Sequence, residues 1–310
     1  MLKRVITISL WLVGIMAGLC LVLAASIVID RGMGVSRLDP LTNTVIPNGT
    51  NPAIRAYVAR PQNDAAGPFP VVIMIHEWWG LKSEIVGKAD ALAQDGYIVI
   101  APDVFRGNTT DWIPTAIWQV STTPTTQVDS DIDAVILWAS NQPDVDPKRV
   151  AIMGFCFGGG TAIRYSVNTP SISATAVFYG ATIADPALLQ RLNGPVLGIF
   201  GGADTMIPLS EVDAFEAGLS AAGVPHEITV YPDMPHAFVK SIDEINNGGP
   251  QQQAWEQLRA FLSRALSGSA SASNVIFTSA TPPPAHPATT PAGVDRFIHQ
   301  FVCDFTTRTS

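Results

Sequence analysis

The chain contains 310 residues, of which 47% are apolar and 14% are charged, and its formal net charge is −8. This length suffices for one large α/β domain or two small ones, with a sizeable core in either case. The acidic balance and the lack of any stripe of Lys and Arg argue against nucleic acid as a partner, because phosphate binding needs clustered positive charge.

The first segment, residues 1–30, is predicted to be a transmembrane anchor. Residues 5–29 contain no charged side chain, and Lys3 and Arg4 precede them as a positive cytoplasmic flank. A helix rises about 1.5 Å per residue, so this run can cross a hydrocarbon layer of about 30 Å. The rest of the chain is then extracytoplasmic and held at the membrane.

A cleaved signal peptide is the alternative interpretation of this segment. Ala24, Ala25 and Ser26 are small residues that follow an apolar core, as at a cleavage site, and cleavage there yields a secreted protein. The anchor is favoured because the uncharged run is longer than a usual signal core and continues to Ile29.

A polar linker is expected at residues 31–50, with a turn at Asn48 and Gly49, and residues 53–59 can form the second arm of a hairpin. Strands are then predicted at 71–75, 97–101, 150–153, 174–179, 196–200 and 227–231, and helices at 83–94, 128–140, 161–167, 186–192, 210–222 and 251–266. Between them, residues 103–126 read as a loop that could cover a pocket. The alternation over residues 51–266 predicts one domain with a doubly wound, mostly parallel sheet and helices on both faces.

The tail, residues 267–310, is rich in Ser, Ala, Thr and Pro and is predicted to be disordered because it has little to bury. A short amphipathic helix around Phe297 and Phe301, resting on a membrane or a partner, is the less favoured alternative.

A candidate nucleophile, Cys156, lies in the sequence Gly-Phe-Cys-Phe-Gly-Gly between a predicted strand and a predicted helix. Small flanking residues permit the sharp turn of a G-x-S-x-G nucleophile elbow, which holds a nucleophile above a sheet. A thiol must lose its proton before it attacks, so a base is expected nearby. The alternative is a buried, inert cysteine in a Gly-rich turn.

Two further strand ends supply suitable partners. Asp204 follows the strand at 196–200, and His236 follows the strand at 227–231. The order nucleophile, acid, histidine is that of the α/β-hydrolases, in which the acid orients the imidazole and the imidazole polarises the nucleophile. Taken alone, Asp204 could be a turn residue and His236 a loop histidine; their joint placement favours a catalytic triad.

The end of the first long strand adds Glu77, a carboxylate beside two tryptophans. This loop is where an α/β-hydrolase places its second oxyanion donor, so the backbone N–H groups of Trp78 and Phe157 are candidates for an oxyanion hole. His76 is expected to be a structural hydrogen-bonding group. No His or Cys pair has metal-ligand spacing, and no GxGxxG follows the first strand, so neither a metal nor a nucleotide cofactor is implied.

These motifs resemble those of the dienelactone hydrolases. The resemblance covers about residues 50–266 and rests on the segments His76–Gly80, Gly154–Gly159, Gly202–Pro208 and Pro235–Phe238. It implies an α/β-hydrolase fold, a triad of Cys156, His236 and Asp204, and a gating role for Glu77, which takes the thiol proton when substrate displaces its usual partner.

The resemblance also implies a substrate, the ring ester of a dienelactone, and a thioester intermediate. Two arginines hold the substrate carboxylate in that family; Arg106 lies near the first of these places, and Lys240 occupies the second. Lysine supplies charge without a bidentate fork, so carboxylate recognition is expected to be looser or different. The expected function is therefore hydrolysis of a small ester or lactone. A general carboxylesterase of the same fold and a non-catalytic protein that binds a ligand or partner at the envelope remain the alternatives.

Overall fold

The computed structural model describes residues 2–62 and 67–267. Its centre is an eight-stranded sheet in the order β1-β2-β4-β3-β5-β6-β7-β8. Strands β3 to β8 are mutually parallel, whereas β2 pairs antiparallel with both β1 and β4. The strands are β1 (Thr44–Ile46), β2 (Ile54–Ala59), β3 (Phe69–Ile75), β4 (Ile98–Pro102), β5 (Val145–Phe155), β6 (Ala174–Phe178), β7 (Val196–Gly201) and β8 (His226–Tyr231).

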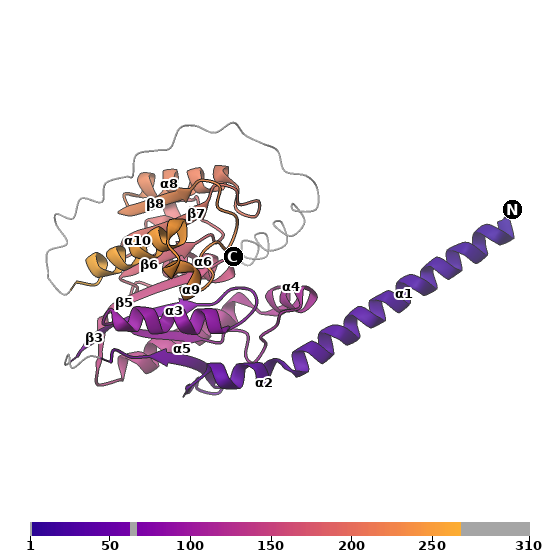
Figure 1. Cartoon of the computed structure of the whole chain (residues 1–310), viewed down its shortest axis with the longest axis horizontal. Coiled ribbons are helices and arrows are strands. Elements are labelled where there is room, and N and C mark those ends of the chain that lie inside the picture. Colours follow the sequence, from indigo (N-terminus) through magenta and orange to yellow (C-terminus); the bar gives the residue numbers. More distant parts are fainter. Residues whose placement is uncertain (1, 63–66, 268–310) are drawn as a thin grey trace.

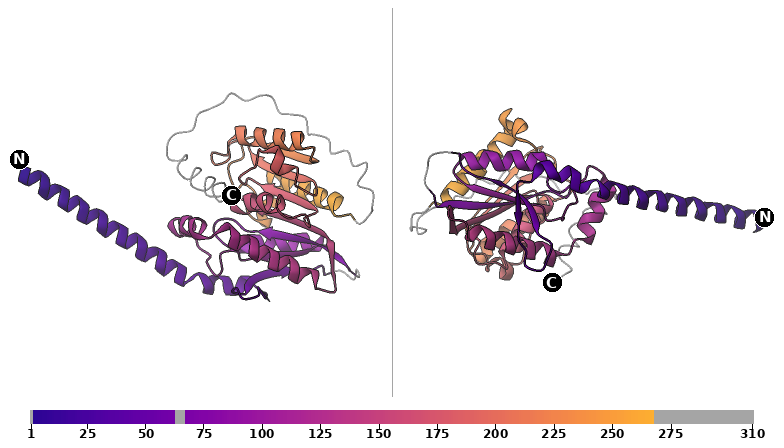
Figure 2. Two further views of the ribbon diagram at one scale, coloured as in Figure 1. Left: turned by 180° about the vertical axis from the view of Figure 1, so that it is seen from behind. Right: turned by 90° about the horizontal axis from the view of Figure 1, so that it is seen from below.

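Helices cover both faces of this sheet (Figures 1 and 2). On one face lie α3 (Ser83–Gln94), α9 (Ile242–Asn246) and α10 (Gly249–Ala265), and on the other lie α5 (Thr125–Ser140), α6 (Phe157–Ser166), α7 (Pro186–Leu189) and α8 (Leu209–Ala222). The central strands are apolar on both sides because both faces are covered. The predicted doubly wound α/β sheet is therefore confirmed.

The segment expected to be a polar linker is folded onto the domain. It contains α2 (Gly34–Leu38), the 3-10 helix η1 (Asp39–Leu41) and β1, and the side chains of Leu38 and Ile46 are fully buried. The hairpin is present, since β1 pairs with β2 around the turn that contains Asn48 and Gly49. A few apolar side chains pack the segment onto the domain. Its mostly polar composition gave no indication of this packing.

A second difference is α4 (Ile113–Thr122), which lies within the segment expected to be a loop. Its Trp, Thr and β-branched residues have modest helix propensity, so the sequence pattern does not favour a helix. Tertiary packing stabilises it: Thr115, Ala116, Gln119 and Val120 are buried at helical spacing.

The long helix α1 (Leu2–Gly32) extends away from the domain, and its C-terminal end contacts α4 (Figure 1). The stretch Ser9–Leu41 contains a window with mean hydropathy 2.8, none of which is buried inside the protein. By length and composition this helix can cross a membrane, and a signal sequence has the same properties. Of the predicted disordered tail, residues 267–310, all but the first residue lie outside the described residues.

Parallel strands place the candidate site residues at one edge of the sheet. Glu77, Cys156, Asp204 and His236 each follow the carboxyl end of a strand, namely β3, β5, β7 and β8. Because β3 pairs with β5 and β7 pairs with β8, the four residues lie along a common edge, where open α/β sheets bind their ligands.

Candidate active site

Cys156 occupies a sharp turn between β5 and α6. Its backbone φ is 53° and ψ is −115°, a conformation that L-residues rarely adopt, and the side chain is buried. A Cβ atom at Gly154 would lie 2.2 Å from the backbone of Gly158, and one at Gly158 would lie 2.3 Å from the carbonyl oxygen of Ile75. The turn can therefore close only with glycine at both positions.

Asp204 and His236 form a hydrogen-bonded pair beside this turn. The Asp204 Oδ2 atom lies 2.7 Å from Nδ1 of His236, and Oδ1 accepts hydrogen bonds from the backbone N–H groups of Met206 and Ile207, at 2.7 and 3.0 Å. Three donors thus fix the carboxylate. The other imidazole nitrogen, Nε2, is buried and has no hydrogen-bond partner among the described residues, so it is available to a reacting group.

The electrostatic surroundings of His236 favour its charged form. Burial by itself lowers the pKa of the imidazole, but the hydrogen bond to Asp204 and the nearby Cys156 outweigh burial and raise the pKa to about 10. Cys156 lies close enough to His236 to raise the pKa of the imidazole, although Nε2 forms no hydrogen bond in this geometry. The ring of Tyr179 packs edge-on at 5.3 Å and helps to hold the imidazole in place.

His76 and Glu77 have different roles although they are adjacent. The His76 Nδ1 atom donates to the carbonyl oxygen of Glu77 at 2.7 Å, and Nε2 accepts from the N–H of Val104 at 3.3 Å. Burial lowers the pKa of His76 to about 4, so the imidazole is neutral at physiological pH. His76 is thus a structural hydrogen-bonding group that fixes the strand end, and the Glu77 side chain is left to face a cavity.

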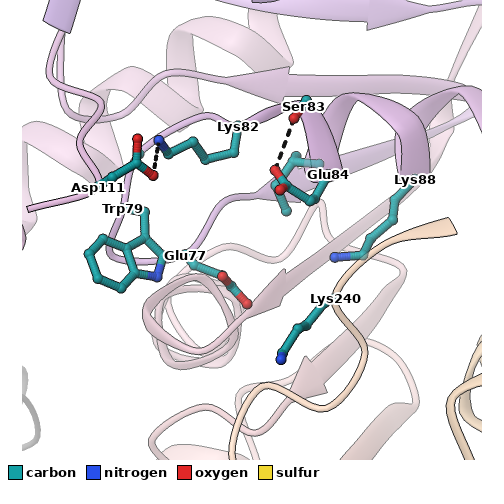
Figure 3. A pocket seen from close by; sticks show the side chains of 10 residues that line it. Glu77, Trp79, Lys82, Ser83, Glu84, Lys88, Asp111 and Lys240 are labelled. Atoms are coloured by element: carbon teal, nitrogen blue, oxygen red, sulfur yellow. Dashed lines mark hydrogen bonds and ion pairs between the residues drawn. The ribbon is translucent and has the colours of Figure 1, made fainter. Parts of the chain in front are cut away.

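That cavity, shown in Figure 3, has a volume of about 480 Å³, and Cys156, Asp204 and His236 are not among the residues that line it. The residues that line it include Glu77, Trp79, Lys82, Glu84, Lys88 and Lys240. In Figure 3 the Glu77 carboxylate and the ammonium groups of Lys88 and Lys240 point into the same space. Glu77 thus lines the cavity and is also close enough to His236 to feel its charge.

Glu77 experiences opposing influences. Burial raises the pKa of its carboxyl group, whereas the positive charges of Lys88, His236 and Lys240 lower it. The net shift is upward. A carboxylate with a raised pKa is a better proton acceptor than an exposed one, which suits a base that acts on a thiol.

The two candidate oxyanion donors occupy equivalent places after the neighbouring strands β3 and β5. Ile75 pairs with Gly154, and Trp78 and Phe157 each lie three residues further along. Neither backbone N–H donates a hydrogen bond within the described part of the chain. The carbonyl oxygen of Trp78 accepts from the side-chain amide of Gln119 on α4, which orients this loop.

The structure separates the two candidate substrate-binding residues. Lys240 lines the cavity. Arg106 does not line it, because its guanidinium forms two hydrogen bonds, of 3.1 and 2.8 Å, with the fully buried Asp131 on α5. The guanidinium of Arg106 is thus paired with a carboxylate inside the domain. The sequence alone could not reveal that this buried carboxylate lies beside it.

Lys88 is a cavity residue that the sequence patterns did not single out. It lies on α3, where Ile85, Lys88, Ala89 and Leu92 are buried at positions i, i+3, i+4 and i+7. A lysine on the apolar stripe of a helix is the signal that could have revealed it. Among residues 2–62 and 67–267, no three His, Cys, Asp or Glu side chains are grouped so that they could hold a metal ion.

The doubly wound sheet, the strained turn between β5 and α6 and the order of the residues at the strand ends define an α/β-hydrolase fold. The chain matches the dienelactone hydrolase family over residues 54–266 and belongs to that family. The protein is therefore a hydrolase of the dienelactone hydrolase type.

Relatives and solved structures agree with this assignment. A Salmonella typhimurium protein provisionally named carboxymethylenebutenolidase is 38% identical over 217 residues, which cover 66% of this chain and 80% of that protein. A Synechocystis protein of the same provisional name is 32% identical over 235 residues, covering 70% and 94%. The crystal structure of a provisionally assigned dienelactone hydrolase from Klebsiella pneumoniae is 31% identical, covers 72% of this chain and all of that one, and superposes with a TM-score of 0.63.

Proposed function

We propose that the protein cleaves a small ester or lactone through a thioester on Cys156, with His236 and Asp204 completing the triad and Glu77 gating the thiol. The observation that carries this proposal is the 2.7 Å pair of Asp204 and His236, whose free Nε2 atom lies beside a cysteine held in a strained elbow. The hydrolase family supplies the reaction class.

In the first step, the Glu77 carboxylate takes the proton from the Cys156 thiol. The thiolate sulfur attacks the ester carbonyl carbon, and the negative charge that develops on the oxygen is stabilised by the N–H groups of Trp78 and Phe157. The carbon–oxygen bond to the leaving group then breaks. Nε2 of the protonated His236 donates its proton to the departing alkoxide, and Asp204 holds the ring in the required orientation.

In the second step, neutral His236 takes a proton from water, and the hydroxide formed attacks the thioester carbon. The carbon–sulfur bond breaks, the acid leaves, and the thiolate regains its proton from Glu77. The enzyme returns to its starting state with His236 protonated. The raised pKa of His236 fits this cycle because the imidazole must begin as an acid.

We infer that substrates with an acidic group are preferred, because the ammonium group of Lys240 faces the cavity. With Arg106 paired to Asp131, however, recognition of a carboxylate lacks the bidentate fork of a guanidinium. This observation favours, as a second candidate, a broader carboxylic-ester hydrolase of the same fold. The provisional names of the relatives point to the lactone.

The test is turnover of a panel of esters and lactones by the full-length protein in detergent, with intact-protein mass spectrometry of quenched samples. Turnover together with an acyl adduct that maps to Cys156 is expected, and Cys156→Ala should show neither. An unchanged rate in that variant would refute the thiol mechanism. A higher rate on the dienelactone than on neutral p-nitrophenyl esters selects the lactone over the general ester.

We further propose that α1 stays attached as a membrane anchor, with the hydrolase domain outside the cytoplasm. The end of α1 is built into the domain: Asp30 is buried, pairs with Arg37 at 2.7 Å and accepts a hydrogen bond from Thr110. Trp112, which is partly exposed, donates from its indole N–H to Ser26 at 3.3 Å, near the end of the uncharged run, where tryptophans are common at membrane surfaces.

Topology is tested with reporter fusions after residue 40 and N-terminal sequencing of the mature protein. Activity of an extracytoplasmic reporter and an intact N-terminus are expected. A cytoplasmic reporter signal contradicts the orientation, and a mature chain that begins near Ser26 identifies a signal peptide instead.

A further inference from the structure

We propose that Lys88 is a positioning residue for this hydrolysis: its ammonium is the counter-ion that keeps Glu77 ionised at the cavity and so controls how readily this carboxylate takes the Cys156 proton. The inference rests on the proposed role of Glu77, and the experiment below separates the two.

The placement of Lys88 is unusual for a lysine. Only 1% of the residue is exposed, and its Nζ atom lies 4.1 Å from the centroid of the Phe155 ring. An ammonium over an aromatic face is stabilised electrostatically. Because Phe155 directly precedes Cys156, this contact fixes the charge of Lys88 next to the elbow.

The Lys88 ammonium lines the same cavity as the Glu77 carboxylate and points into it (Figure 3). A buried lysine keeps its charge at a cost in free energy unless an opposite charge lies nearby, so its position at this cavity indicates a local electrostatic role. Burial lowers the pKa of Lys88 to about 8, and the carboxylate that most strongly opposes this shift is Glu77.

The relation between the two residues is reciprocal. Among the positive charges that lower the pKa of Glu77, Lys88 is the strongest, ahead of His236 and Lys240. In Figure 3 the two side chains point into the same cavity from the loop after β3 and from α3. Each charge thus depends on the other more than on any other opposite charge nearby.

Lys82, Arg106 and Lys240 are either paired with another carboxylate or exposed to solvent. Lys82 is bonded to Asp111 at 2.8 Å, and Arg106 is bonded to Asp131. Lys240 is exposed, so solvent screens its charge. The remaining titratable groups around Glu77 and Lys88 are Glu84 on α3, Glu244 on α9, His236 after β8, Tyr179 after β6 and Cys156 itself. Lys88 is therefore the buried cation best placed to hold Glu77 in its charged form.

The test uses Lys88→Met in the full-length protein and measures how kcat/KM for an uncharged ester and the rate of Cys156 alkylation by iodoacetamide depend on pH. Loss of the counter-ion should move the acidic limb of both profiles to higher pH by about one unit or more, since an adjacent opposite charge shifts a carboxyl pKa by that amount. Lys88→Arg keeps the charge and should restore the limb. Lys88→Gln repeats the test with a polar uncharged side chain if the Met variant is unstable.

Glu84→Gln is the matched control because the charge of Glu84 raises the pKa of Glu77, so its removal should move the limb in the opposite direction. A limb that stays in place in a folded Lys88→Met or Lys88→Gln variant overturns the proposal. Glu77→Gln separates the two levels. If this variant retains the limb, the proposed role of Glu77 fails; if it removes the limb while the uncharged Lys88 variants do not move it, only the role of Lys88 fails.

Discussion

On the triad side of the site, made up of Cys156, Asp204 and His236, hydrogen bonds and close backbone packing hold each group in place. On the cavity side, made up of Glu77, Lys88 and Lys240, the groups interact through charge without fixed hydrogen bonds between them. Both sides lie at the carboxyl edge of one sheet.

The difference indicates how the site divides its work. A nucleophile and its partners must keep their geometry through every turnover, which requires rigid support. Charges that interact across a cavity can exchange partners when a ligand enters. Substitutions on the triad side should therefore remove the reaction, whereas those on the cavity side should change its pH range and its substrates.

The largest effect is expected for Cys156→Ala. Without the nucleophile no thioester can form, so kcat for any ester should fall by at least about 10⁴-fold. Steady-state assays check this, with Cys20→Ala in α1 as the matched control, which should retain full activity. Equal rates in both variants would remove the distinction between the two sides.

Asp204→Asn tests the orientation of the imidazole. The amide can no longer stabilise the imidazolium or fix its tautomer, and kcat should fall by about 10³-fold with little change in the fold. Asp233→Asn, an exposed carboxylate in the loop after β8, is the control and should be nearly silent. A mild effect at Asp204 would mean that the triad side is less rigid than its hydrogen bonds suggest.

Arg106→Met tests whether this arginine belongs to the cavity or to the core. It leaves Asp131 buried without its ion pair, so the free energy of unfolding should fall by about 3 kcal/mol, while kcat/KM at 20 °C stays within about twofold. Chemical denaturation and kinetics measure the two quantities. Arg60→Met breaks a half-exposed pair with Asp144 and should cost under about 1 kcal/mol. A large rise in KM with normal stability would instead show that Arg106 binds the substrate.

The protonation of His236 predicts a pH dependence of stability. Its pKa is raised from about 6.5 in the unfolded chain to about 10, so its contribution is fully present below about pH 6.5 and is lost as the pH rises towards 10. The free energy of unfolding should therefore fall by about 3 kcal/mol between pH 7 and pH 9.5. Denaturant titrations measure it, and Asp204→Asn should flatten the slope. An equal slope in both proteins would place the titration elsewhere.

The smallest effect is expected for Lys240→Gln. Removal of one exposed charge should lower kcat/KM for an anionic ester by about tenfold and leave a neutral ester unaffected. Lys148→Gln, which is exposed and remote from the cavity, is the control. An equal loss for both esters would show that Lys240 does not select substrate charge.

The alternation of apolar runs and helical patterns was sufficient to predict the parallel sheet, because strands buried on both faces have a distinctive sequence. Most predicted elements agree with the structure to within a few residues. The errors, at the docked segment before β2 and at α4, fall where composition is polar or β-branched and a few tertiary contacts decide the conformation.

For the site, patterns along the chain were enough to predict which residues follow the strand ends, since the Gly-rich elbow and the order of Cys156, Asp204 and His236 can be read locally. The partners of the charged groups, in contrast, depend on the folded structure. Arg106 pairs with Asp131 on α5, and Lys88 lies over the ring of Phe155 on β5 and senses the charge of Glu77 in the loop after β3. Electrostatic energy depends on distance and burial in space, and neither can be read from spacing along the chain.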